Sequence, residues 1–144
     1  MARLTLELAD KIVDAALRHG REKDFAPLSV AVLDPGGHLI AFKREDRSGI
    51  LRFDIAFGKA WGALGMGMDS RALGTRAEQN PRFFAALGAL SAGRVIPNAG
   101  GLLLHGADGA SIGAIGVSGD QAERDEAVAL EAMRGLGLAG AESR

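Results

Sequence analysis

The chain has 144 residues, with 17 lysines and arginines against 18 aspartates and glutamates and a formal charge of -1. This length suits one domain with a substantial core, and the balanced charge argues against nucleic acid or a membrane surface as a partner. The absence of cysteine excludes disulfides, thiolate nucleophiles and cysteine-ligated metals. Because no long apolar run or signal-like N-terminus is evident, we expect a single cytoplasmic domain over residues 1–144.

The first part of the chain predicts a helix followed by a β-hairpin. Apolar residues recur at helical spacing over 6–19, where Thr5 is placed as the N-cap and Gly20 as the end of the helix. β-Branched residues on either side of the turn sequence Asp34-Pro-Gly-Gly37 predict strands over 28–33 and 38–44. Since four turn residues cannot carry a parallel crossover, these two strands are antiparallel.

The remainder predicts two helices, a second hairpin and a last helix. A glycine-rich helix is expected over 51–66 and a short one, opened by Pro81, through Leu90. Strands over 100–105 and 110–117 flank a turn, and Asp120 caps a final helix that extends from Gln121 to about Leu136. Interior glycines in a helix or strand usually mark a place where another backbone comes close.

This order of elements predicts an α+β layered domain in which helices flank an antiparallel sheet of about five strands. The chain contains 21 glycines, and only 5% of its residues are aromatic. Such small side chains allow close packing between subunits, so we expect a homo-oligomer with closed symmetry.

Four charged residues are candidates for binding an anion or moving a proton. Arg44 and Lys59 could together clamp a carboxylate or a haem propionate, and ion pairs at a wet surface are their alternative role. Asp125 and Glu126, near the start of the last helix, could supply a general base. Acidic residues are also favoured there by the helix dipole alone.

His19 is the candidate metal-ligating residue. The chain has three histidines, and no two lie close enough in sequence to form a local metal-binding pair. An imidazolium at the end of the first helix is favoured by the dipole, so capping is one role for His19. Axial ligation of haem iron, which needs one imidazole facing an apolar pocket, is the other.

A set of short motifs extends in order across nearly the whole chain. Its members are Val30-Ala-Val-Leu-Asp34, Gly36 or Gly37, Leu39, Arg44-x-Asp46, Ala56-x-x-Lys59-Ala60, Pro97, Gly100-Gly101, Ile112-Gly-Ala-Ile-Gly-Val-Ser-Gly119 and Asp125-Glu126. In this order they resemble the GlcG/HbpS family, which includes the C-terminal domain of the PduO cobalamin adenosyltransferases. The most specific part is the long glycine-rich segment followed shortly by Asp-Glu.

The resemblance implies a profilin-like fold, assembly into homo-oligomers of up to eight subunits, and a small ligand. Several relatives bind haem, so it implies a haem-binding or haem-sensing domain. An enzyme acting on a small carboxylate or hydroxy acid in organic acid metabolism is one alternative, and a non-catalytic assembly domain is another. The motifs make candidate ligand-binding residues of Arg44, Asp46, Lys59, Gly100 and Gly101.

One loop departs from the family pattern. Members commonly continue Arg-x-Asp with Gly-Ala, whereas this chain continues with Arg47-Ser48. A bulky charge therefore stands where small residues are usual, and it could alter ligand choice at the loop.

Overall fold

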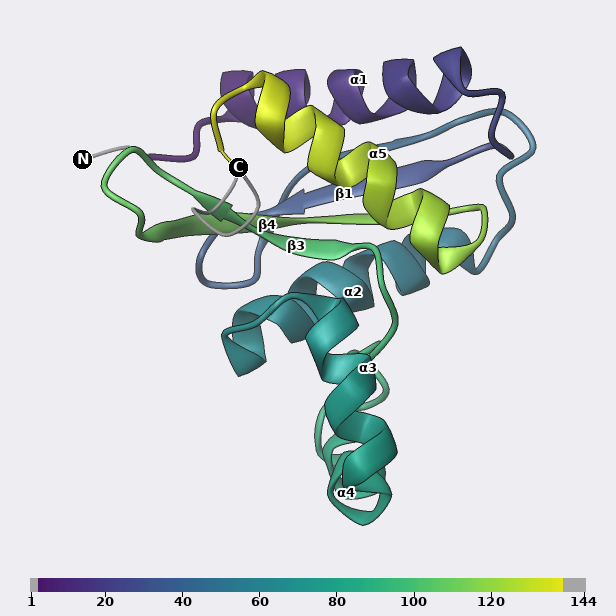
Figure 1. The fold of residues 1–144 in the computed structure, drawn as a ribbon, viewed down its shortest axis with the longest axis vertical. Helices are drawn as coiled ribbons and strands as arrows, with labels where there is room; N and C mark the ends of the chain where they lie inside the picture. The colour runs from purple at the N-terminus through teal and green to yellow at the C-terminus, as the bar shows by residue number, and fades with distance from the viewer. Residues whose placement is uncertain (1–2, 139–144) are drawn as a thin grey trace.

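The computed structural model describes residues 3–138, which form five helices and four strands (Figure 1). In chain order these are α1 (Leu6–Glu22), β1 (Ser29–Leu33), β2 (Leu39–Arg44), α2 (Arg52–Met66), α3 (Ser70–Gln79), α4 (Pro81–Leu90), β3 (Gly101–His105), β4 (Ser111–Ser118) and α5 (Ala122–Gly135). None of the helices in this part of the chain has the length and apolar character needed to cross a membrane.

The sheet has the order β2-β1-β4-β3, and every neighbouring pair is antiparallel. Both predicted hairpins, β1 with β2 and β3 with β4, are confirmed. The two hairpins are joined by the pairing of β1 with β4, which extends from Ser29 opposite Ser118 to Leu33 opposite Ala114. The prediction of about five strands is wrong for residues 3–138, because the stretch between the hairpins forms three helices and supplies no further strand.

Helices cover both faces of the sheet, as predicted for an α+β layered domain. Figure 1 shows α1 and α5 on one face and α2 on the other. β1 is buried on both faces. Its Val30 and Val32 pack with Ile12 of α1 in the main core, whereas Leu33 packs with Ala60 of α2 in a smaller cluster. Because successive side chains of a strand point to opposite faces of the sheet, β1 packs against both helical layers.

Two strand glycines let α2 lie directly on the sheet. A Cβ at Gly116 of β4 would collide with the carbonyl oxygen of Ala56, and one at Gly101 of β3 with that of Lys59. The close backbone approach predicted from glycines is therefore seen here, and it places the middle of α2 against the ends of β3 and β4.

Two local predictions differ from the structure, and a third is confirmed. Gly20 does not end α1, which continues to Glu22, because Gly20 is buried where a Cβ would press on Leu28. Gln121, not Asp120, is the N-cap residue of α5. The Asp120 carboxylate instead accepts the backbone N–H groups of Ala26 and Gln121, each at 2.7 Å. The Thr5 cap of α1 is confirmed, since its side chain accepts the N–H of Leu8 at 3.1 Å.

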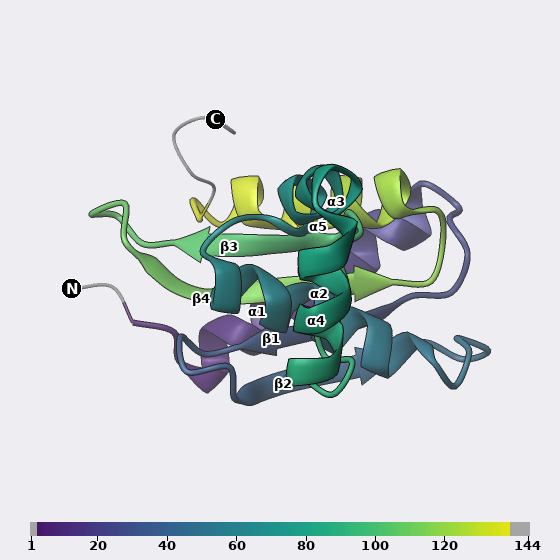
Figure 2. The ribbon, with the colours of Figure 1, turned by 90° about the horizontal axis from the view of Figure 1, so that it is seen from below.

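Residues 70–94, here called the arm, hold α3 and α4 and project away from the sheet below α2 (Figure 1, and seen from below in Figure 2). Helix α3 was not predicted from the sequence. No residue of α4 is buried, and its Phe83 and Leu90 are 53% and 83% exposed. The arm therefore presents apolar side chains that the rest of residues 3–138 does not cover.

Candidate functional site

Lys59 and Asp125 form an ion pair inside the protein. Lys59 Nζ lies 3.2 Å from Asp125 Oδ2 and donates to the carbonyl oxygen of Val117 at 2.9 Å. Asp125 Oδ1 accepts the backbone N–H of Asp120 at 3.0 Å. The side chains of Lys59 and Asp125 are only 2% and 1% exposed. The pair thus ties α2, the end of β4 and the first turn of α5 together.

Gly100 and Gly101 stand beside this pair. Gly100 has a φ of +128°, and a Cβ there would lie 2.8 Å from Lys59 Nζ. Gly101 donates its N–H to Ser70 Oγ at 2.7 Å, which anchors the start of α3. The structure therefore brings four of the predicted site residues together, Lys59, Asp125, Gly100 and Gly101, in the interior of the protein.

Burial dominates the electrostatics of the pair. It lowers the pKa of Lys59 and raises the pKa of Asp125, and in each case the charge of the partner opposes the effect. Removing either partner would leave the other as an isolated buried charge. Because both side chains are enclosed, neither reaches a ligand at the surface.

Glu126, next to Asp125 in sequence, points elsewhere. Its carboxylate accepts Arg71 Nε at 3.0 Å and Arg71 Nη2 at 2.7 Å. This forked contact raises the pKa of Arg71 through the hydrogen bonds and charge of Glu126. Glu126 therefore links α5 to α3, and the two acids share no common site.

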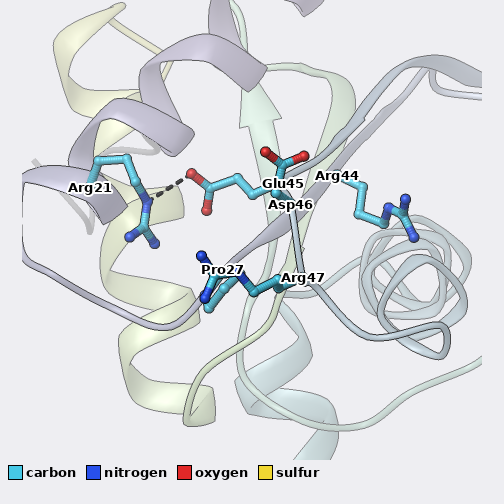
Figure 3. Close-up of a pocket in the computed structure, with 6 residues that line it drawn as sticks. All are labelled: Arg21, Pro27, Arg44, Glu45, Asp46 and Arg47. Atoms are coloured by element: carbon cyan, nitrogen blue, oxygen red, sulfur yellow. Dashed lines mark ion pairs between the residues drawn. The ribbon is translucent and has the colours of Figure 1, made fainter.

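Arg44 and Asp46 line an open hollow of about 570 Å³ beyond the end of β2 (Figure 3). We call this cavity the loop hollow. Its other lining residues are Arg21, Pro27, Glu45 and Arg47. In Figure 3 the side chain of Arg44 points away from Arg21. Since Arg44 is exposed and Lys59 is enclosed, the structure does not bring the two predicted clamp residues into one site.

His19 lines a second hollow, of about 250 Å³, between α1 and α5. Its Nδ1 lies 3.0 Å from Glu131 Oε2, and the other oxygen of Glu131 lies 2.7 Å from Lys23 Nζ. The side chain of His19 is 23% exposed. The other residues around this α1–α5 hollow are Lys11, Asp14, Ala15, Arg18, Ala132, Gly135 and Leu136.

The α1–α5 hollow combines an imidazole with apolar and basic surroundings and with one carboxylate, that of Asp14. Ala15, Ala132 and Leu136 supply apolar lining, and Lys11 and Arg18 supply positive charge. Nothing in the sequence near His19 points to Glu131, because the fold alone brings α5 alongside α1. Among residues 3–138 no group of three or more histidines or acids is placed to hold a bare metal ion.

One protein family matches nearly the whole chain. The model of the family described as haem degrading protein HbpS-like matches residues 4–134. The chain belongs to the HbpS-like family. The resemblance found in the sequence motifs is thereby confirmed. No match was found among curated proteins.

Solved structures of HbpS-like proteins share this fold. A double mutant of Streptomyces reticuli HbpS is 30% identical, with a TM-score of 0.80 over 95% of this chain and 89% of that chain. Klebsiella pneumoniae protein ORFY is 27% identical, with a TM-score of 0.82 over 93% of this chain and 91% of that one. A PduOC structure in complex with haem is 24% identical and has a TM-score of 0.85, covering 96% and 98% of the two chains.

Proposed function

We propose that this HbpS-like protein binds haem at the α1–α5 hollow, with His19 as the axial ligand. The family description names haem, and a solved structure with the same fold is a haem complex. The His19–Glu131 contact is the observation that carries the proposal. A carboxylate on one ring nitrogen fixes the tautomer and orientation of an imidazole and leaves the other nitrogen for a metal.

The residues around the hollow fit a haem group. Apolar side chains of Ala15, Ala132 and Leu136 suit the macrocycle, whereas Lys11 and Arg18 suit its propionates. When bound, haem supplies an iron whose properties depend on the axial ligand and its surroundings. At about 250 Å³ the hollow is smaller than the roughly 300–1,000 Å³ of ligand pockets, so it accommodates one edge of the group.

A haemin titration followed by absorbance tests the proposal. We expect a shift of the Soret band that saturates at one haemin per chain, and His19→Ala should weaken binding at least about tenfold. Glu131→Gln should weaken it less, because the amide still holds the ring without a charge. His38→Ala, which removes an exposed histidine at a hairpin turn, is the matched control.

Two results would count against this assignment. No Soret shift at equimolar haemin would remove haem as the ligand. If the His19→Ala and His38→Ala variants bound haemin with equal affinity, His19 would not be the axial residue and haem would bind at another place.

We also propose that the chain assembles with copies of itself through the arm. The arm contains four arginines and one glutamate, a charge of +3, whereas the rest of the chain holds 13 basic and 17 acidic residues, a charge of −4. The exposed apolar side chains of Phe83 and Leu90 therefore sit on a basic projection that complements an acidic body. A second copy supplies such a body.

The enzymatic alternative draws no support from this geometry. A clamp on a small carboxylate would use Lys59, and proton transfer would use Asp125, yet both groups are enclosed and bonded to each other. Glu126 is likewise held by Arg71. We therefore give Lys59, Asp125, Gly100 and Gly101 a structural part, as a tie between the layers.

A further inference from the structure

The loop hollow contains one arginine that is fixed by the fold. Arg21 Nε lies 2.7 Å from Glu45 Oε2, and Arg21 Nη2 donates to the carbonyl oxygens of Phe25 at 2.6 Å and Ala26 at 3.0 Å. Glu45 is itself held by the backbone N–H of Leu28 at 2.8 Å. The guanidinium of Arg21 is therefore pre-positioned at the wall of the hollow.

A second arginine, Arg47, faces the same hollow from a strained backbone. Its φ is +71°, in the left-handed region, which costs a non-glycine residue roughly 1–2 kcal/mol. The turn that contains it is closed by the N–H of Ser48, which donates to the carbonyl of Glu45 at 3.1 Å. Ser48 is buried, and its Oγ lies 2.8 Å from Ser29 Oγ of β1, so the loop is anchored to the sheet.

The guanidinium of Arg47 has no ion pair or hydrogen bond to any of residues 3–138. In Figure 3 its side chain extends across Pro27 toward Arg21, in the direction opposite to Arg44. Two guanidinium groups thus line one side of the hollow, and Glu45 balances only one of them. Asp46 also lines the hollow, which leaves three positive and two negative side chains around it.

We propose that Arg21 and Arg47 form a subsite for an oxyanion, the phosphate or carboxylate group of a small molecule. Arg47 can present its planar fork to two oxygens of either group, whereas Arg21, whose Nε and Nη2 are already bonded, contributes its charge and its Nη1. Such charge-assisted pairs are stronger than neutral hydrogen bonds. The strained backbone at Arg47 supports a functional role for its side chain. Such unfavourable conformations cost free energy that the surrounding structure must offset, and they cluster at binding and active sites. The subsite is independent of the haem proposal, because His19 faces Glu131 on α5 whereas Arg21 faces Glu45 after β2.

Calorimetric titration of the full chain with inorganic phosphate and with succinate tests the subsite. We expect saturable binding of at least one, and the stronger of the two identifies phosphate or carboxylate as the recognised group. Arg47→Gly should weaken that binding at least about tenfold while raising the melting temperature, because glycine adopts a positive φ without a Cβ penalty. Loss of binding in a more stable protein cannot come from unfolding.

Arg3→Ala is the matched control, since it removes one exposed arginine at the opposite end of α1. Its affinity for the anion should equal that of the wild type. Equal binding by the wild type and Arg47→Gly would overturn the proposal, and so would the absence of binding by either anion at millimolar concentration. An equal loss in Arg3→Ala and Arg47→Gly would show a general effect of net charge and would also overturn it.

Discussion

Lys59 and Asp125 come from helices on opposite faces of the sheet, and their charged groups meet 3.2 Å apart in the interior. Few side chains other than lysine are long enough to extend from α2 past the end of β4 to α5. The space for it comes from Gly100, where a Cβ would lie 2.8 Å from the ammonium. This contact holds the two layers in one position relative to each other.

Lys59→Met should destabilise the protein by about 3–5 kcal/mol, because Asp125 then stays buried without its counter-ion. Chemical denaturation measures this as a lower free energy of unfolding. Lys59→Met combined with Asp125→Asn should recover part of the loss, since no charge then remains in the interior. A loss below about 1 kcal/mol in the single variant would contradict the view that the pair is enclosed.

Gly101→Ala should cost about 3 kcal/mol, because its Cβ would collide with the backbone carbonyl of Lys59, which has little freedom to move. Gly65→Ala, in the same helix as Lys59, is the control. No atom lies within 4 Å of a Cβ at Gly65, so alanine should stabilise α2 by about 0.5–1 kcal/mol. Thermal unfolding of the two variants should therefore shift in opposite directions, and equal shifts would argue against close contact between α2 and β3.

Asp120 should make the stability of the protein depend on acid pH. Backbone N–H groups of Ala26 and Gln121 lower the pKa of its carboxyl below the ordinary aspartate value of about 3.9. The folded state therefore binds this proton more weakly than the unfolded state, so the stabilisation is complete above that value and is lost as pH falls through the folded pKa. Asp120→Asn should lose less unfolding free energy than the wild type between about pH 4 and pH 2. If the unfolding free energies of the two proteins fell in parallel with pH, Asp120 would not be the source of this pH dependence.

Leu90→Asp should reduce the size of the assembly, because it places a negative charge on the apolar side of the basic arm. Leu90 is 83% exposed in the single chain, so the substitution should leave the unfolding free energy of the subunit unchanged. Sedimentation velocity is the measurement, and Leu6→Asp, on α1 with 67% exposure, is the control. A wild-type chain that sediments as a monomer would contradict the role of the arm, as would an equal effect of both variants.

The elements with strong local patterns could be predicted from the sequence. Alternation and turn residues identified both hairpins, and the apolar spacing over 6–19 identified α1 with its Thr5 cap. Helix α3 was missed because Leu73 is its only buried apolar residue, so its sequence carries no clear helical periodicity.

The candidate sites depend on contacts that no local pattern shows. Lys59 and Asp125 lie 66 residues apart, and a lysine in an apolar helix gives no sign of a partner so far along the chain. Glu131, which orients His19, reaches it only because α1 and α5 lie side by side. The motif resemblance selected Lys59, Gly100 and Gly101 as a group, but it did not reveal that they meet in the interior.

The order β2-β1-β4-β3 places strands from different hairpins at the centre of the sheet. Each hairpin can form early, because its two strands are joined by a short turn. The β1–β4 ladder instead closes a loop that contains all the residues between these two strands. Loop closure of that length carries a large entropic penalty and slows folding. The nascent chain therefore cannot complete its central ladder until β4 has left the ribosome.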